Sequence, residues 1–449
     1  MSNVIGQQAV VIGAGMGGLS AARVLADHFE RVLVLERDAL PADPLDRAGV
    51  PQGRHVHALL AGGQRALGEL FPGFESDLVR AGAVPTRAGL DVRVERPGFD
   101  PFPQRDLGFD AYAMSRAVIE WTVRRRVEEC ASIELRQRCR VEELVPRVDG
   151  AGVTEVRYTH HDGKVDTASA DVVIDASGRG TPTLDFLGAL GCTRPEETII
   201  GVDLAYATAV FGIPDDAPSD WKGVLCFGPG GRGSRGSLML PLEGHRWIVT
   251  VGGRHGDNPP GDEAGFMAYV QSLRTPTVYN AIQHAKRLGD IARFRFPESV
   301  YRHYERVENF PRGVLPLGDA ICRFNPVYGQ GMSVAAQEAQ ALGRLLAARA
   351  HETDPLANLA PTFFAEVSAL IATPWVAAAI PDFVHPDTRG ERPANLEQTL
   401  KFGVALGKLA ARDPAVHKLT AEVQHLLKPR SVYQDPELVR RVGAVMAEQ

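Results

Sequence analysis

The stretch AVVIGAGMGG, residues 9 to 18, decides the fold of this chain. Its first four residues are apolar and mostly β-branched, a composition typical of a strand buried in a parallel sheet. The next six match the pattern GxGxxG, in which a glycine-rich backbone and a helix N-terminus bind an anion. We expect Gly13 to allow a tight turn, Gly15 to admit a pyrophosphate and Gly18 to let the helix pack close to the strand. The stretch therefore predicts a nucleotide-binding turn.

The residues that follow complete a dinucleotide-binding unit of about 30 residues. Leu19 to His28 has the apolar spacing of a helix, and Arg31 to Leu35 has the composition of a second buried strand. Glu36 comes directly after this strand, where an acidic side chain accepts the ribose hydroxyl protons of an adenosine and would repel a 2′-phosphate. The unit therefore favours FAD or NAD over NADP.

A second glycine-rich stretch, GDAICRFNPVYGQGM at residues 318 to 332, distinguishes FAD from NAD. The apolar run before it predicts a strand, which would place Asp319 at the sheet edge where ligands bind, within reach of a ribityl hydroxyl of a flavin. Gly329 and Gly331 open a predicted helix, Met332 to Ala347. Its N-terminal N–H groups could face the flavin N1 and C2 oxygen, where reduction builds negative charge. A glycine-capped structural turn is the alternative interpretation.

The composition limits the classes of function. With 449 residues the chain is long enough for two or three domains. A formal net charge of -6, with both signs mixed along the chain, offers no basic surface for nucleic acid. The five cysteines are scattered, without a CxxC pair or metal-ligand spacing, which favours a reducing cytoplasmic location over a disulfide framework. The sequence predicts no metal site.

We find no stretch with the roughly 18 to 20 apolar residues that a membrane span requires. The nearest, Ala369 to Val384, is interrupted by Pro374 and Pro381. We interpret it as a buried helix pair or a pocket wall. A membrane-surface helix is the alternative, and it would need a basic face.

Together these pieces resemble the FAD-dependent monooxygenases of the p-hydroxybenzoate hydroxylase-like fold, over nearly the whole chain. Five stretches are similar to the flavin epoxidases of bacterial polyether biosynthesis and their natural-product relatives: RAGVPQGRHVHALLAGG (47–63), MSRAVIEWTVRRR (114–126), DASGRGTP (175–182), LMLPLEGHRWIVTVGG (238–253) and GDAICRFNPVYGQGM (318–332). The resemblance implies an α/β chain with three parts: a Rossmann-like FAD-binding domain from 1–75, 110–180 and 299–350, a mixed β-sheet substrate domain from 76–109 and 181–298, and a C-terminal helical region, 351–449.

The resemblance also assigns site residues. Those that would hold the ADP half of FAD are Gly13, Gly15, Gly18 and Glu36, with Arg37 beside the adenosine. Arg116, at the start of a helix, would reach the phosphate region, and Arg47 would reach the flavin side. Those that would meet the flavin and the substrate are Asp319 at the ribityl chain, Gly331 and Met332 at the isoalloxazine edge, and Pro326 to Tyr328 in the substrate cavity.

The resemblance implies a monooxygenase reaction. FAD would be reduced with NAD(P)H, form a C4a-hydroperoxide with O2, and give one oxygen atom to an apolar substrate of polyketide or prenyl type, by epoxidation or hydroxylation. In the single-component aromatic hydroxylases the strand-and-turn motif found here at Asp171 to Gly180 carries Asp-Gly and helps to bind NAD(P)H, but this chain has Asp175-Ala176. The fragment is compatible with a cofactor contact or a structural turn. Reduction could therefore occur on this chain or through a separate flavin reductase.

Two other functions could use the same cofactor elements. One is a flavin-dependent reductase or dehydrogenase of a polyprenyl or polyketide double bond, and the other is a non-catalytic FAD-binding protein. The long insert argues against the second, because a carrier needs no enclosed cavity. A flavin halogenase is disfavoured, because the tryptophans, at 121, 221, 247 and 375, form no WxW motif.

The substrate half is predicted to be a cavity over the flavin. Ser237 to Leu242 and Arg246 to Val251 flank a turn and predict a β-hairpin that forms one wall. Helices at Thr362 to Thr373 and Leu396 to Ala411 would close the other side.

The sequence names no catalytic residue. Epoxidation needs no general base, whereas hydroxylation of a phenol would benefit from one. His55 and His57 lie near the predicted flavin, but a single histidine is more often a structural hydrogen-bonding residue than a catalyst.

Overall fold

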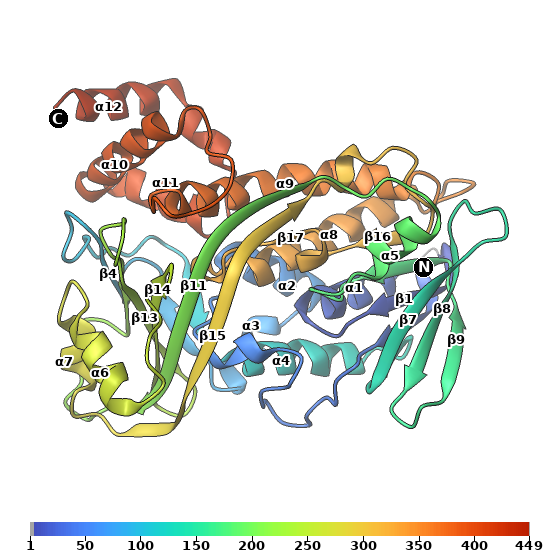
Figure 1. Cartoon of the computed structure of the whole chain (residues 1–449), viewed down its shortest axis with the longest axis horizontal. Coiled ribbons are helices and arrows are strands. Elements are labelled where there is room, and N and C mark those ends of the chain that lie inside the picture. The colour runs from blue at the N-terminus through green and yellow to red at the C-terminus, as the bar shows by residue number, and fades with distance from the viewer. Residues whose placement is uncertain (1–3, 449) are drawn as a thin grey trace.

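A parallel sheet lies at the centre of the chain, for which a computed structural model describes residues 4–448 (Figure 1). In the described part, five strands form this sheet in the order β16-β10-β1-β2-β6. Their bounds are β1 Gly6–Ile12, β2 Phe29–Leu35, β6 Ile133–Arg136, β10 Val172–Asp175 and β16 Val314–Pro316. The GxGxxG turn joins β1 to helix α1, Met16–Leu25. The strand, helix and strand predicted from the first motif are therefore confirmed, with their ends shifted by two or three residues.

Both faces of the parallel sheet are covered, which is why its central strands contain apolar, buried runs such as residues 9 to 12 and 32 to 35. Ala9 and Val11 of β1 pack in the main core with helices α1 and α8, Gly331–Arg349. Val10 and Ile12 face the other way, towards an antiparallel sheet within residues 139–169. That small sheet consists of β7 Cys139–Pro146, β8 Val153–His160 and β9 Val165–Ser169, and it was not predicted from the sequence.

A second, mixed sheet contains seven strands in the described chain, in the order β17-β15-β11-β14-β13-β12-β4. Their bounds are β4 Val92–Glu95, β11 Glu197–Gly212, β12 Gly223–Cys226, β13 Gly236–Leu242, β14 Arg246–Arg254, β15 Arg287–Arg302 and β17 Cys322–Arg323. The predicted hairpin is confirmed, because β13 and β14 pair antiparallel up to Leu242 and Arg246. Helices α6, Glu263–Gln271, and α7, Thr277–Ile282, cover one face of this sheet.

Shorter elements connect the two sheets. They are α2 Ala61–Leu70, α3 Phe74–Arg80, β3 Val84–Arg87, β5 Asp110–Ala113, α4 Arg116–Glu128 and α5 Pro182–Ala189. Arg116 is the first residue of α4, as expected, and the side chain of Ser115 caps this helix by accepting the N–H of Val118 at 3.2 Å.

Four helices follow α8: α9 Leu359–Asp382, α10 Leu396–Arg412, α11 Pro414–Gln424 and α12 Pro436–Ala447, all within the described residues. Figure 1 shows α9 lying along α8, while α10, α11 and α12 gather near the C-terminus. The latter three share a small apolar core with Phe102. The fold class predicted from the sequence, an α/β chain with a Rossmann-like sheet, a mixed sheet and C-terminal helices, is confirmed.

Of the two interpretations of Ala369 to Val384, the helix pair was wrong, because residues 369 to 382 belong to one continuous helix, α9. The pocket wall agrees with the structure, because Ala369 and Thr373 line a pocket. Pro374 and Pro381 lie inside that helix. Packing of buried side chains such as Phe363 and Ile371 in the main core offsets the backbone hydrogen bonds that the prolines remove. Among the described helices, α9 is the one long and apolar enough to cross a membrane, with a mean hydropathy of 1.7, a test that core helices of soluble proteins also pass.

Candidate cofactor and substrate site

The three predicted motifs meet at one edge of the parallel sheet. The N–H of Gly13 donates to Leu35 O at 2.8 Å, which joins the first glycine turn to the end of β2. The N–H of Ala176 donates to Ile12 O at 3.0 Å, and the N–H of Leu317 donates to Asp175 O at 2.9 Å. The turns after β1, β10 and β16 therefore lie side by side, at the carboxyl ends of the strands where α/β sheets bind ligands.

The first glycine turn has the shape of a phosphate-binding loop. Gly13 has a φ of 95°, and a Cβ there would lie 2.7 Å from Ala176 O. A Cβ on Gly18 would lie 1.9 Å from Gly13 O, so the helix could not approach the strand with any larger residue. By contrast, a Cβ on Gly15 would meet no described heavy atom within 4 Å. That free space at the N-terminus of α1 fits a pyrophosphate.

Glu36 is buried at the end of β2 and is already hydrogen-bonded. Its carboxylate accepts the N–H of Ala14 at 2.7 Å and the N–H of Asp38 at 2.9 Å, and Arg47 Nη1 lies 3.2 Å away. A carboxylate offers about four acceptor positions. The three contacts leave one acceptor position for a ribose hydroxyl, or two if Arg47 moves away.

Arg47 lies at the Glu36 end of the site, whereas the resemblance implied the flavin side. Its guanidinium pairs with Asp38 at 2.8 Å and Glu120 at 2.7 Å as well as with Glu36, and it donates to Ala14 O at 3.2 Å. Burial alone would lower the pKa of Arg47, but the nearby carboxylates, above all Glu120, raise it above its ordinary value. The position follows from this charge pairing, because a buried guanidinium needs carboxylate partners.

Arg116 completes this ion network and keeps one free donor. Its Nη2 donates to Glu120 at 2.8 Å, while its buried Nη1 has no partner among residues 4–448. Ser177 Oγ, in the turn after β10, is likewise buried and unpartnered in the described chain. These two groups and the space at Gly15 suit the phosphates of FAD. Arg37 is different, since its side chain is 67% exposed and its acidic neighbour Asp38 is 4.0 Å away.

The second glycine-rich stretch brings the carboxyl group of Asp319 to the start of α8. A Cβ on Gly331 would lie 3.8 Å from Asp319 Oδ1, so Asp319 sits beside the N-terminus of this helix. Burial raises the pKa of Asp319, against the opposing effects of Arg323, Arg179 and Arg116. Several cations thus surround the carboxyl group expected to bind the ribityl chain. They form a positive region that would favour negative charge on a flavin.

Glu338, which sequence reasoning missed, lies further along α8, against the turn that carries Asp319. It is fully buried on α8 and accepts the N–H of Gly318 at 2.6 Å. Burial raises the pKa of Glu338 to about 8, although that hydrogen bond favours the charged form. At neutral pH the residue is mostly a neutral acid that fixes the turn carrying Asp319.

The loop from Asn325 to Tyr328 is tied to α9 by another missed residue, Asp382. This fully buried carboxylate accepts from Asn325 Nδ2 at 2.8 Å and from the Tyr328 hydroxyl at 2.9 Å. Arg254, at the end of β14, pairs with it at 2.9 Å. The cluster joins this loop, here named the flavin loop (residues 325–328), to the mixed sheet and to the C-terminal end of α9.

The remaining residues assigned to the flavin and substrate lie on the same loop. Pro326 is partly exposed, and the partly buried side chain of Met332 packs against the main core at the start of α8. Ala379 of α9 and Phe383, which directly follows that helix, pack with Tyr206 of β11, as does Leu396 of α10. The ends of these two helices therefore cover the face of the mixed sheet opposite α6 and α7.

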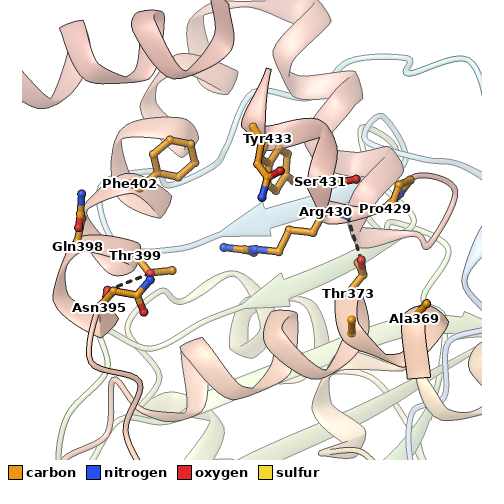
Figure 2. A pocket seen from close by; sticks show the side chains of 12 residues that line it. Ala369, Thr373, Asn395, Gln398, Thr399, Phe402, Pro429, Arg430, Ser431 and Tyr433 are labelled. Atoms are coloured by element: carbon orange, nitrogen blue, oxygen red, sulfur yellow. Dashed lines mark hydrogen bonds between the residues drawn. The ribbon is translucent and has the colours of Figure 1, made fainter. Parts of the chain in front are cut away.

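A separate pocket of about 600 Å³ lies between α9, α10 and the 3-10 turn Arg430–Gln434 (Figure 2). Figure 2 shows Arg430 extending into it between Thr373 and Thr399. It is lined by residues of both helices predicted to close the substrate cavity, such as Thr373 and Thr399, but by none of the predicted cofactor residues and by no residue of the 326–328 segment. It is therefore not the predicted cavity over the flavin.

Comparison with known proteins identifies relatives over most of the chain. It is 36% identical to Protein Rv3254 of Mycobacterium tuberculosis, over 76% of this chain and 73% of the relative. It is 27% identical to digeranylgeranylglycerophospholipid reductase 2 of Methanopyrus kandleri, over 78% of this chain and 79% of the relative. It is 25% identical to kynurenine 3-monooxygenase of Salinispora tropica, over 80% of both chains.

The fold is shared with solved flavoprotein structures. The flavin-dependent brominase Bmp2 superposes with a TM-score of 0.69 at 16% identity, covering 99% of this chain and 98% of the brominase, which shows a common fold alone. The FAD binding domain model matches residues 7–360. This match contains every cofactor residue predicted from the sequence, so FAD is confirmed as the cofactor type at the level of the family. The chain belongs to the FAD-binding domain family and has the p-hydroxybenzoate hydroxylase-like fold.

Proposed function

We propose that this chain is an FAD-dependent monooxygenase that transfers one oxygen atom of O2 to an apolar natural-product substrate of polyketide or prenyl type, by epoxidation or hydroxylation. The observation that carries the proposal is the meeting of the glycine turns after β1 and β16 at one sheet edge, beside the covered face of the mixed sheet. The similarity to kynurenine 3-monooxygenase supports it. The reductant would be NAD(P)H, acting on this chain or through a separate reductase.

FAD supplies the redox and oxygen chemistry when it is bound. The chain's residues bind and orient it: the free donor of Arg116 would hold the pyrophosphate, and Asp319 would hold the ribityl chain. The N-terminus of α8 would favour negative charge on the reduced ring. Ala379 of α9 and Phe383 directly after it cover one side of the mixed sheet, which would keep water from the reacting centre.

The second candidate is a flavin-dependent reductase of a polyprenyl double bond, favoured by the similarity to the digeranylgeranylglycerophospholipid reductase. Oxygen separates the two. We would reduce the FAD-loaded protein without air, add a panel of polyene and phenolic polyketides, and admit 18O2. A monooxygenase gives a product carrying one 18O atom. A product that gains two hydrogen atoms without label, formed before oxygen is admitted, would instead identify a reductase.

A further inference from the structure

A chain of hydrogen bonds under the mixed sheet ends on His55, which lies in the loop before α2. The backbone N–H of Val56 donates to Thr250 Oγ1 at 3.1 Å. Thr250 Oγ1 lies 2.6 Å from Thr208 Oγ1, which in turn lies 2.6 Å from His55 Nδ1. Thr208 and Thr250 are directly opposite each other on β11 and β14, so the sheet register builds this chain.

Counting hydrogens separates the two possible directions of the chain. If Thr250 donates to Thr208 and Thr208 donates to His55 Nδ1, the unpaired hydrogen is the one on His55 Nε2. The reverse direction leaves the hydroxyl hydrogen of the buried Thr250 without an acceptor in the described part of the chain. The first direction, which a ligand accepting from Nε2 requires, makes Nδ1 an acceptor, so the proton of a neutral imidazole is on Nε2. Thr208 and Thr250 are therefore positioning residues.

His55 is held neutral. It is buried, and burial together with the nearby Arg54 lowers the pKa of His55 to about 4. Its Nε2 has no hydrogen-bond partner within residues 4–448. A buried N–H without a partner is costly, and a ligand that accepts from it recovers that cost.

Tyr206 supplies a second free donor next to His55. The two rings lie edge to face with centroids 5.3 Å apart, and Phe294 stacks on Tyr206 at 5.9 Å. The hydroxyl of Tyr206 is buried and also unpartnered among the described residues. Burial raises the pKa of Tyr206 far above neutrality and exceeds the opposing effect of Arg254, while Asp382 adds to the rise, so the hydroxyl keeps its proton and can donate.

The surroundings of these donors are otherwise mainly apolar. Tyr206 packs in one cluster with Leu204, Phe296 and Phe383, and Val327 of the flavin loop packs against the same cluster. Arg254 also keeps one buried unpartnered N–H, but its charge is matched by Asp382. The subsite thus combines apolar walls with hydrogen-bond donors and has no net charge from this ion pair.

We propose that His55 and Tyr206 bind the substrate, their Nε2–H and hydroxyl groups donating to one carbonyl or other acceptor oxygen of an otherwise apolar molecule. This inference rests on the proposed function for the presence of a substrate here, and it adds the polar group which that substrate must carry. The oxygen would anchor the molecule beside the loop at Val327, so that its apolar part lies towards the flavin.

The first test is the tautomer of His55. In FAD-loaded protein labelled with 15N-histidine, NMR should show His55 as a neutral ring protonated on Nε2 at pH 7, with the signal assigned by its loss in His55→Gln. Thr208→Val should raise the population protonated on Nδ1, because the donor to Nδ1 is gone. An Nδ1-protonated ring in the unsubstituted protein would overturn the proposal.

The second test is the preference for an acceptor oxygen. Tetralin and 1-tetralone differ by one carbonyl oxygen, and their binding to the FAD-loaded protein can be followed by flavin fluorescence. We expect the ketone to bind about tenfold more tightly for each hydrogen bond it gains. Tyr206→Phe should remove about tenfold of that preference and leave tetralin binding unchanged.

The matched control is Tyr158→Phe, because Tyr158 is a fully buried tyrosine in the small sheet on the other face of the parallel sheet. It should leave both affinities unchanged. Equal binding of the two probes, or no binding of the ketone, by FAD-loaded protein overturns this proposal alone. Failure of the purified protein to bind FAD at all contradicts the proposed function instead.

Discussion

Glu36 Oε2 accepts the backbone N–H of Ala14 at 2.7 Å, which fastens the end of β2 to the glycine turn after β1. The carboxylate expected to bind ribose is therefore also part of the scaffold that shapes the phosphate loop. This double role changes what a substitution at Glu36 should do.

Replacing Glu36 by Ala should weaken FAD binding and destabilise the fold together. The change removes the acceptor of two backbone N–H groups and leaves Arg47 with one carboxylate fewer, which should cost about 2–4 kcal/mol of unfolding free energy. Urea denaturation and FAD titration measure the two effects. Glu36→Gln is the control, because it keeps one acceptor oxygen and should lose less stability. Unchanged FAD affinity in Glu36→Ala would remove Glu36 from the cofactor site.

Arg116→Ala should lower FAD affinity by about 10- to 100-fold, the value of a charge-assisted hydrogen bond to phosphate. The reason is the free buried Nη1 of Arg116, which faces no protein acceptor in the described chain. Quenching of FAD fluorescence on titration measures the change. Arg37→Ala is the matched control and should change affinity little, since Arg37 is largely exposed. If the two variants bind FAD equally well, Arg116 does not bind the phosphates.

Glu338→Gln should flatten the pH dependence of stability. The pKa of Glu338 is raised to about 8 in the folded protein from an ordinary value of 4.5. Folding therefore favours the protonated form, so its contribution is fully present below pH 4.5 and is lost as pH rises towards 8. The slope is at most about 1.4 kcal/mol per pH unit.

Urea denaturation of the FAD-free protein between pH 5 and 8 would measure this slope. Glu338→Gln should reduce it by up to about 1.4 kcal/mol per pH unit, the contribution of one proton. Glu437→Gln, at an exposed glutamate of α12, should leave the slope as it is. An identical slope in Glu338→Gln and the unsubstituted protein would mean that Glu338 is ionised in the fold.

Asp382→Asn should destabilise the protein by about 3–5 kcal/mol, because it leaves Arg254 buried without its charge partner. The matched control is Asp203→Asn, which breaks the ion pair with Arg389 at the surface and should cost less than about 1 kcal/mol. Chemical denaturation of both variants gives the comparison. Similar small losses would show that the Asp382 cluster does not hold the flavin loop to α9.

Local patterns in the sequence were enough to predict the elements around the cofactor. An apolar run before glycines predicts a strand, a turn and a helix because neighbouring residues alone determine these features. The same holds for the hairpin of β13 and β14 and for Arg116 at the start of α4. The small sheet β7–β9 was missed, because its strands contain many polar residues and carry no motif.

The sequence by itself determined the strand–turn–helix units, the family and the cofactor type, because glycine conformations and apolar runs act over a few neighbouring residues. Tertiary structure alone decided which side chains share the site. Asn325 meets Asp382 across 57 residues, Arg254 meets it across 128, and His55 meets Thr208 across 153. Such pairs have no characteristic spacing in the sequence, because a buried charge or donor pairs with whichever group the packing of the two sheets places beside it. For the same reason Arg47 pairs with the three carboxylates at the Glu36 end and not with the flavin side, where the resemblance had placed it.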